Sequence, residues 1–172
     1  MAVKILIPHK KIHLRINSLA TEIAKTYSDK NMLLLAVLNG SMPTATLLMQ
    51  ALWKKGLRDV ELDTISISSY GKSDIPNEPV LKKEPSIPLE KRHVLIVEDI
   101  IDTGHTMHFL YKYLIDKKAK SIRTFTLLSK PSKRETPFVA DYTGFEIGDE
   151  WVEGFGLDTN QKGRGNPDII KK

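Results

Sequence analysis

The chain has 172 residues and a mass of 19.4 kDa, which suits one domain with a sizeable core rather than two domains. Hydrophobic residues make up 41% of the chain and charged residues 27%, a composition that excludes intrinsic disorder and collagen-like repeats. No apolar run approaches the roughly 20 residues of a membrane helix, and the first residues lack the cleavage site of a secretory signal. Because cysteine is absent, disulfides, zinc–thiolate sites and a thiol nucleophile are excluded, and we expect a cytoplasmic protein.

The chain is basic, with 26 Lys and Arg residues against 21 Asp and Glu residues, a net charge of +5 and a pI near 9.3. A basic balance is compatible with binding to nucleic acid, to an anionic membrane surface or to an anionic small substrate. Charge alone does not choose among these three classes of ligand.

Three segments have the periodicity of amphipathic helices. Apolar residues recur on one face between His9 and Ser28, and again from Pro43 until Gly56, where glycine predicts a helix end. A third stripe runs from Met107 to Ile115, and the basic residues 117–120 after it suit a helix C-terminus.

Short apolar runs between these helices predict strands. The runs 32–38, 94–97 and 122–128 are nearly continuous, 62–67 alternates with polar residues, and a fifth strand is expected within 138–147. Continuous Val, Ile and Leu runs are typical of strands buried on both faces, and hence of a parallel sheet. Alternation of strands with helices therefore predicts a three-layer α/β domain with right-handed crossovers.

Two stretches depart from this pattern. Residues 71–92 are rich in proline and charge and show no usable period, which is typical of a lid, a binding loop or a disordered insert. The tail after Asp149 is rich in glycine and charge and is too short to be a domain.

The densest chemical signal follows the predicted strand 94–97. Glu98 and Asp99 come directly after the strand, and Asp102 to Thr106 (DTGHT) opens the third helix. Ligands of open α/β sheets bind beyond the carboxyl ends of the strands, and a helix start rich in small residues offers free N–H groups to a phosphate. Neighbouring carboxylates would accept hydrogen bonds from a cis-diol, so the segment suits a ribose 5-phosphate. The alternative is a simple helix cap beside two solvated acids.

Residues 94–106 resemble the phosphoribosyl-pyrophosphate fingerprint of the type I phosphoribosyltransferases, and the chain from about Met32 to Arg164 resembles their hypoxanthine-guanine branch. The resemblance implies a mainly parallel five-stranded sheet flanked by helices, with a core at about 9–145. It also implies a small hood from about 1–8 and 146–172 and a mobile loop at about 70–92.

The resemblance implies roles for the fingerprint itself. Glu98 and Asp99 would hold the ribose hydroxyls, directly or through Mg²⁺, and Asp102 would lie beside N7 of a purine as general acid or base. The 5-phosphate would be wrapped by a loop of five residues, of which His105 has no catalytic role: Asp102, Thr103, Gly104, His105 and Thr106.

The resemblance also assigns groups to the pyrophosphate. Leu38, Asn39 and Gly40 match a loop whose peptide groups bind the diphosphate, often with a cis bond between the first two residues; relatives mostly have Lys or Arg where this chain has Asn39. Arg164 matches an arginine that contacts the same group. Ser69 and Tyr70 would fold over the diphosphate as catalytic residues when the loop closes and shields the reaction from water.

Four residues match the base-binding part of the family. Lys130 would donate to the 6-oxo group of a purine, and Trp151 would stack on the ring. Val152 would offer backbone groups to the base edge, and Asp158 would reach the base side and a second Mg²⁺. The alternatives without a role in binding are a solvated charge for Lys130 and ordinary core packing for Trp151. Glu153 departs from the family, which has an apolar residue there.

The resemblance thus implies a purine salvage enzyme that uses Mg²⁺ to transfer 5-phosphoribosyl from phosphoribosyl pyrophosphate to N9 of hypoxanthine, guanine or both. A homodimer or homotetramer with no membrane or nucleic-acid partner is expected. The alternatives are an RNA-binding transcription attenuator of the same fold, against which the dispersed lysines argue, and a phosphoribosyltransferase for xanthine or a pyrimidine. A signalling receiver domain is excluded, because its acid pair belongs near the N-terminus.

Overall fold

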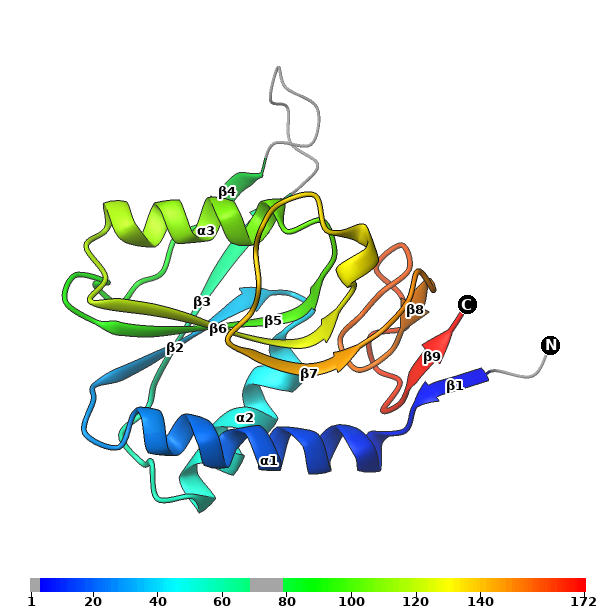
Figure 1. Ribbon diagram of the computed structural model, residues 1–172, viewed down its shortest axis with the longest axis horizontal. Helices are drawn as coiled ribbons and strands as arrows, with labels where there is room; N and C mark the ends of the chain where they lie inside the picture. Colours follow the sequence, from blue (N-terminus) through cyan, green and yellow to red (C-terminus); the bar gives the residue numbers. More distant parts are fainter. Residues whose placement is uncertain (1–3, 69–78) are drawn as a thin grey trace.

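A computed structural model describes residues 4–68 and 79–172 (Figure 1). Along the chain the elements are β1 (Lys4–Ile7), α1 (His9–Thr26), β2 (Met32–Leu38), α2 (Met42–Lys54), β3 (Glu61–Ser68), β4 (Val80–Lys83), β5 (His93–Ile101), α3 (His105–Asp116), β6 (Ser121–Ser129), the 3-10 helix η1 (Pro131–Lys133), β7 (Tyr142–Glu146), β8 (Val152–Glu153) and β9 (Ile169–Lys171). Among the described residues, no helix is both long and apolar enough to cross a bilayer.

The large sheet has the strand order β4-β3-β2-β5-β6-β7. Its last five strands run parallel, which confirms the five predicted strands, and β4 pairs antiparallel with β3 at the edge. β4 lies within residues 71–92, where the sequence shows no usable period. This strand carries only two apolar residues, Val80 and Leu81, so its sequence has no period to detect.

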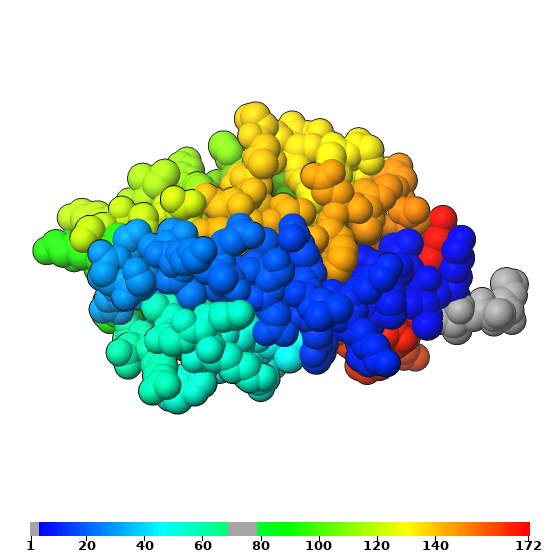
Figure 2. All heavy atoms as spheres, turned by 60° about the horizontal axis from the view of Figure 1, so that its bottom comes forward, coloured from blue at the N-terminus to red at the C-terminus, as the bar shows by residue number. Residues whose placement is uncertain are grey.

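Helices cover both faces of the sheet, which confirms the three-layer architecture. On β2, Leu34 and Ala36 pack in the core under α1 and α2, whereas Leu33 and Leu35 pack in the core under α3. Figure 1 shows α3 on one side of the sheet and the other two helices opposite, and Figure 2 shows α1 and α2 side by side across the outer face. Successive residues of β2 are buried on opposite faces of the sheet, and therefore the whole strand is apolar.

A second, small antiparallel sheet has the order β1-β9-β8 and joins the two ends of the described chain. The backbone N–H of His9 donates to Asp168 Oδ1 over 2.7 Å, which ties the start of α1 to the segment before β9. Figure 1 shows this sheet beyond the carboxyl ends of β6 and β7. Parallel register places Ser129 beside Ile101 and Glu146, so the loops that follow these strands meet at one edge.

Candidate active site

A cavity of about 410 Å³ opens at the carboxyl end of β5. Its walls come from the end of that strand, the loop that follows it, the first turn of α3 and one residue after η1: Glu98, Ile100, Ile101, Asp102, Thr103, Gly104, His105, Thr106, Met107 and Glu135. The fingerprint residues predicted from the sequence therefore share one cavity, except Asp99, whose carboxylate lies against Gly40.

Glu98 and Asp99 form an acid pair, of which Glu98 is buried and Asp99 is half-buried. Glu98 is only 7% exposed, and its Oε1 accepts from the Asp99 backbone N–H over 3.1 Å, while Asp99 Oδ1 accepts from the Ile100 N–H over 2.8 Å. Burial, and then repulsion from Asp99, raises the pKa of Glu98 well above its usual value. Burial likewise raises the pKa of Asp99, and its hydrogen bonds with Glu98 and the Ile100 N–H, together with the charge of Arg164, only partly offset this effect.

The acid pair is suited to a cation that the protein itself does not supply. Within residues 4–68 and 79–172, neither Glu98 nor Asp99 forms an ion pair, and no cluster of three or more His, Cys, Asp or Glu side chains could enclose a metal ion. Two carboxylate groups fit Mg²⁺ that takes its other ligands from substrate and water, as this ion commonly does at phosphate-binding sites.

The loop from Asp102 to Thr106 is fixed by the segment Arg134–Thr136 after η1, called the strap below. Arg134 Nη1 donates to the Asp102 carbonyl over 2.8 Å, and the N–H of Glu135 donates to the Thr103 carbonyl over 3.0 Å. Gly104 has a φ of 92° and lies so close to Thr136 that a Cβ would come within 2.2 Å of its hydroxyl. The strap thus holds the loop from outside.

The sequence analysis did not single out the segment Arg134–Thr136, because Arg134 and Glu135 have the character of ordinary surface charges. Within the loop, His105 is half exposed and its Nε2 lies 2.7 Å from Glu135 Oε2. α3 begins at His105 without an acidic residue in its first turn, so the positive end of its dipole is free for an anion. Asp102 itself is exposed.

The loop after β2 packs tightly against the acid pair. The peptide bond between Leu38 and Asn39 is cis. A Cβ on Gly40 would lie 1.6 Å from Asp99 Oδ2, and a Cβ on Gly156, whose φ is 97°, would lie 1.9 Å from the Gly40 carbonyl oxygen. Only glycine fits at position 156, where a Cβ would meet backbone, whereas at position 40 a Cβ would displace the Asp99 carboxylate. The two close approaches place the loop between Asp99 and the segment after β8.

Arg164 and Asp158 are ion-paired, with Arg164 Nη2 2.7 Å from Asp158 Oδ1. Arg164 Nη1 also donates to the Gly156 carbonyl over 2.6 Å, and Asp158 Oδ2 accepts from the Gln161 N–H over 2.8 Å. The charge of Arg164 reaches Asp99, whose pKa it lowers against the effect of burial. The structure therefore brings the two predicted residues to the Gly40 loop and couples them to each other, which the sequence did not foresee.

Two of the residues predicted to bind the base have surroundings that argue against the non-functional explanations given for them above. Lys130 is not on the open surface, since it is 6% exposed where the chain leaves β6, and its ammonium forms no hydrogen bond or ion pair with the described residues. Trp151 is not a core residue, since it is 61% exposed; its indole N–H donates to Thr159 Oγ1 over 2.9 Å.

Val152 and Glu153 lie in β8, opposite Lys171 and Ile170 of β9. Val152 is buried, and the departure at Glu153 places a buried carboxylate 3.2 Å from Lys172 Nζ. The ion pair explains how a buried carboxylate is accommodated at this position.

The remaining two predicted residues, Ser69 and Tyr70, lie outside the described part of the chain.

Comparison with known proteins agrees with this geometry. A family model described as a phosphoribosyl transferase domain matches residues 2–160. The chain is 38% identical to the hypoxanthine-guanine phosphoribosyltransferase of Bacillus subtilis, over 96% of this chain and 91% of that protein, and 36% identical to the enzyme of the same name from Streptococcus pneumoniae over the same shares.

Solved structures agree as well. A hypoxanthine-guanine phosphoribosyltransferase from Bacillus anthracis superposes with a TM-score of 0.90 at 33% identity and covers 99% of both chains. The hypoxanthine phosphoribosyltransferase of Trypanosoma cruzi, in complex with its product IMP, gives a TM-score of 0.90 at 34% identity and covers 98% of this chain and 89% of that one. The chain therefore belongs to the phosphoribosyltransferase family, in its hypoxanthine-guanine branch.

Proposed function

We propose that the protein is a cytoplasmic purine salvage enzyme that transfers the 5-phosphoribosyl group from phosphoribosyl pyrophosphate to N9 of hypoxanthine, guanine or both, giving IMP or GMP and pyrophosphate. The observation that supports the proposal is the cavity in which Glu98, the partner of Asp99 in the acid pair, lies beside the start of α3. A ligand with a phosphate next to a cis-diol would suit this cavity, because the phosphate would meet the start of α3 and the diol would meet Glu98.

The sugar phosphate would lie along the loop after β5. Thr103, Gly104, His105 and Thr106 would surround the 5-phosphate with N–H and hydroxyl donors at the helix start. Glu98 and Asp99 would take the ribose hydroxyls or Mg²⁺.

Glu98 and Asp99 would hold one Mg²⁺ and Asp158 a second, and the bound metal would neutralise charge on the diphosphate. Leu38, Asn39 and Gly40 would bind the diphosphate through their peptide groups. The family resemblance implies a positive charge at the position of Asn39 in most relatives, and in this chain the charge of Arg164 acts on Asp99, whose pKa it lowers.

The base would lie between Trp151 and the end of β6. Lys130 is a donor only, so it would favour a 6-oxo group over the 6-amino group of adenine. Trp151 would stack on the purine ring, and the buried Val152 would offer its backbone to the base edge. Asp158 would face the base from the Mg²⁺ side.

The transfer breaks the bond from C1 to the pyrophosphate oxygen and forms the bond from C1 to N9, with the pyrophosphate leaving from the opposite face. Asp102, which is exposed at the mouth of the cavity, would accept the proton that the purine loses. Ser69 and Tyr70 are proposed to cover the diphosphate and exclude water from the oxocarbenium-like state.

We also propose that the enzyme acts as a homodimer or homotetramer. The oligomeric state of the Trypanosoma cruzi relative has been examined through its C-terminal region, and here β9, near the C-terminus, lies in the small sheet. Light scattering on the purified protein gives the mass directly, and a monomeric mass would contradict this part of the proposal.

The test is a spectrophotometric assay with phosphoribosyl pyrophosphate, Mg²⁺ and one base at a time: hypoxanthine, guanine, xanthine, adenine or uracil. We expect turnover with hypoxanthine or guanine and none with adenine or uracil. Absence of turnover with every 6-oxopurine would overturn the proposal, and RNA retained at moderate salt by such an inactive protein would favour the transcription attenuator instead.

A further inference from the structure

Thr159 is the one hydrogen-bond partner of the exposed Trp151 side chain that the described structure provides. We propose that Thr159 is a positioning residue that fixes the ring of Trp151 for stacking on the base, so that the turn carrying Asp158 and Arg164 also sets base affinity. This inference rests on the proposed function of Trp151 and goes beyond it by assigning a role to a residue outside the family motifs quoted above.

The ring needs such a partner because little else restrains it. Trp151 is 61% exposed, and its indole plane has no ring or cation contact among the described residues. An exposed aromatic side chain changes rotamer on the picosecond-to-nanosecond scale. Ordering it only when the base arrives would cost rotamer entropy, which weakens binding. A hydrogen bond to the indole N–H fixes the ring beforehand.

Thr159 can serve as a fixed acceptor because its backbone is locked in a two-residue hairpin. The Thr159 N–H donates to the Lys162 carbonyl over 3.0 Å, and the Lys162 N–H donates back over 3.1 Å. Asn160 and Gln161 between them have φ values of 52° and 64°, both left-handed as in a type I′ turn. The 2.9 Å bond therefore anchors the indole to rigid backbone.

The same turn is also held by contacts of Gly163 with Glu153 and of Arg164 with Asp158 and Gln161. A Cβ on Gly163 would lie 2.1 Å from Glu153 Cδ, so the turn rests directly on that buried carboxylate. At the far end Arg164 binds Asp158 over 2.7 Å, and Arg164 Nη2 donates to Gln161 Oε1 over 3.1 Å. One compact turn thus holds the groups proposed for the base and for the pyrophosphate.

The test compares Thr159→Val, which keeps the shape and removes the hydroxyl, with Thr159→Ser, which keeps the hydroxyl. Thr46→Val is the matched control, because Thr46 is exposed on α2 and its hydroxyl bonds only to its own helix. We expect Thr159→Val to raise the KM for hypoxanthine about three- to tenfold, the effect of one neutral hydrogen bond. The KM for phosphoribosyl pyrophosphate and kcat should stay within about twofold, and Thr159→Ser should recover the wild-type KM.

A fluorescence readout follows the ring itself. Trp53 and Trp151 are the two tryptophans of the chain, so a Trp53→Phe background reports on Trp151 alone. We expect Thr159→Val to lower the emission anisotropy of Trp151 in the free protein, and Thr46→Val to leave it unchanged. Unchanged anisotropy, or equal rises in KM for both substrates, would overturn the positioning role.

Failure of the proposed function has a different signature. In that case the wild-type protein itself turns over no 6-oxopurine, and the anisotropy of Trp151 still decides whether Thr159 fixes its ring.

Discussion

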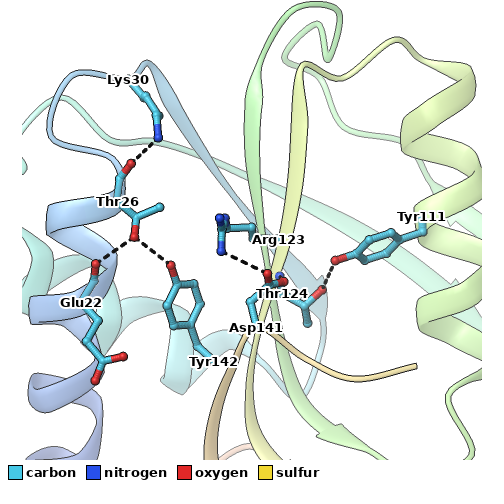
Figure 3. A network of polar contacts seen from close by, with 8 residues as sticks. All are labelled: Glu22, Thr26, Lys30, Tyr111, Arg123, Thr124, Asp141 and Tyr142. Carbon is cyan, nitrogen blue, oxygen red and sulfur yellow. Dashed lines mark hydrogen bonds and ion pairs between the residues drawn. The ribbon is translucent and has the colours of Figure 1, made fainter. Parts of the chain in front are cut away.

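The two ends of the large sheet treat buried polar groups in opposite ways. At the amino end, the protein pairs them with one another: Tyr142 donates to Thr26 over 3.2 Å, and the Thr124 hydroxyl donates to Tyr111 over 3.3 Å (Figure 3). At the carboxyl end, Glu98 and Lys130 are equally buried, yet neither forms an ion pair within the described part of the chain.

The difference distinguishes buried polar groups that stabilise the fold from buried groups that we expect a ligand to contact. A buried charge without a partner opposes folding, so a protein keeps one only where the surrounding structure compensates for it and the site uses it. Even at the amino end the hydroxyl of Tyr27 is buried without a hydrogen-bond partner among the described residues, but burial raises its pKa and keeps it neutral. At the carboxyl end, burial likewise raises the pKa of Glu98, and neither its carboxyl group nor the ammonium of Lys130 has an ion-pair partner within the described residues.

The largest expected effect is on catalysis. Asp102→Asn removes the proposed proton acceptor while preserving the size of the side chain, so kcat should fall about 10²- to 10⁴-fold. The affinity for phosphoribosyl pyrophosphate, measured by calorimetry, should be retained, because the loop is fixed through the Asp102 carbonyl rather than its carboxylate. An unchanged kcat would remove Asp102 from this role.

Next in size is a change at the contact between the Gly40 loop and the acid pair. In Gly40→Ala the new methyl group would occupy the place of Asp99 Oδ2, so the carboxylate must move while the backbone stays. We expect kcat/KM for phosphoribosyl pyrophosphate to fall about 10²-fold, as for a misplaced active-site group. Gly165→Ala is the control, because a Cβ there meets nothing within 4 Å; equal activity of the two variants would contradict the packing described.

At the amino end a variant should alter stability alone. Asp141 accepts from the Thr124 N–H over 2.8 Å and pairs with Arg123 over 3.2 Å (Figure 3). We expect Asp141→Asn to lower the free energy of unfolding by about 1–3 kcal/mol, since part of a hydrogen-bonded network is lost. Urea denaturation measures this change, and kcat should remain at the wild-type value. If Asp141→Asn lowered kcat without lowering the free energy of unfolding, the purely structural role given to the amino end of the sheet would be contradicted.

The smallest effect concerns Asp63 on β3, which holds the segment after β4. Burial raises the pKa of Asp63, but the N–H groups of Ile87, Thr64 and Ser86 and the ammonium of Lys83 outweigh it, so the pKa is lowered. A lowered folded-state pKa stabilises the protein above the unfolded value of about 3.9, and this stability is lost as the pH falls through the folded pKa.

Asp63→Asn should therefore be less stable than the wild type by about 1 kcal/mol at pH 7, and the difference should shrink in acid. Urea denaturation at several pH values measures it. A difference independent of pH would show that the carboxylate charge is not what anchors the segment.

Much of the fold was predictable because its signals are local. Continuous apolar runs predicted the five parallel strands, and the fingerprint from Glu98 to Thr106 is contiguous in sequence, so its members had to share the end of β5. The short edge strand β4 was missed because two apolar residues do not make a period.

The contacts that complete the site were not predictable, since they join residues far apart in the chain. Arg134 fixes the carbonyl of Asp102, and Gly156 meets the carbonyl of Gly40, but no spacing rule relates these pairs. Sequence placed Asp158 and Arg164 in the site without indicating that they pair with each other. Burial of Lys130 likewise depends on the tertiary structure.

The contrast between the two ends is tested most directly by the rise in Tm that Mg²⁺ and phosphoribosyl pyrophosphate cause without a base. A ligand that binds only the folded protein raises Tm. We predict a rise of several degrees for the wild type and for Asp141→Asn at the amino end, and no rise for Asp99→Asn at the carboxyl end. An equal rise in all three proteins would contradict the account, because the acid pair would then have no part in binding the substrate.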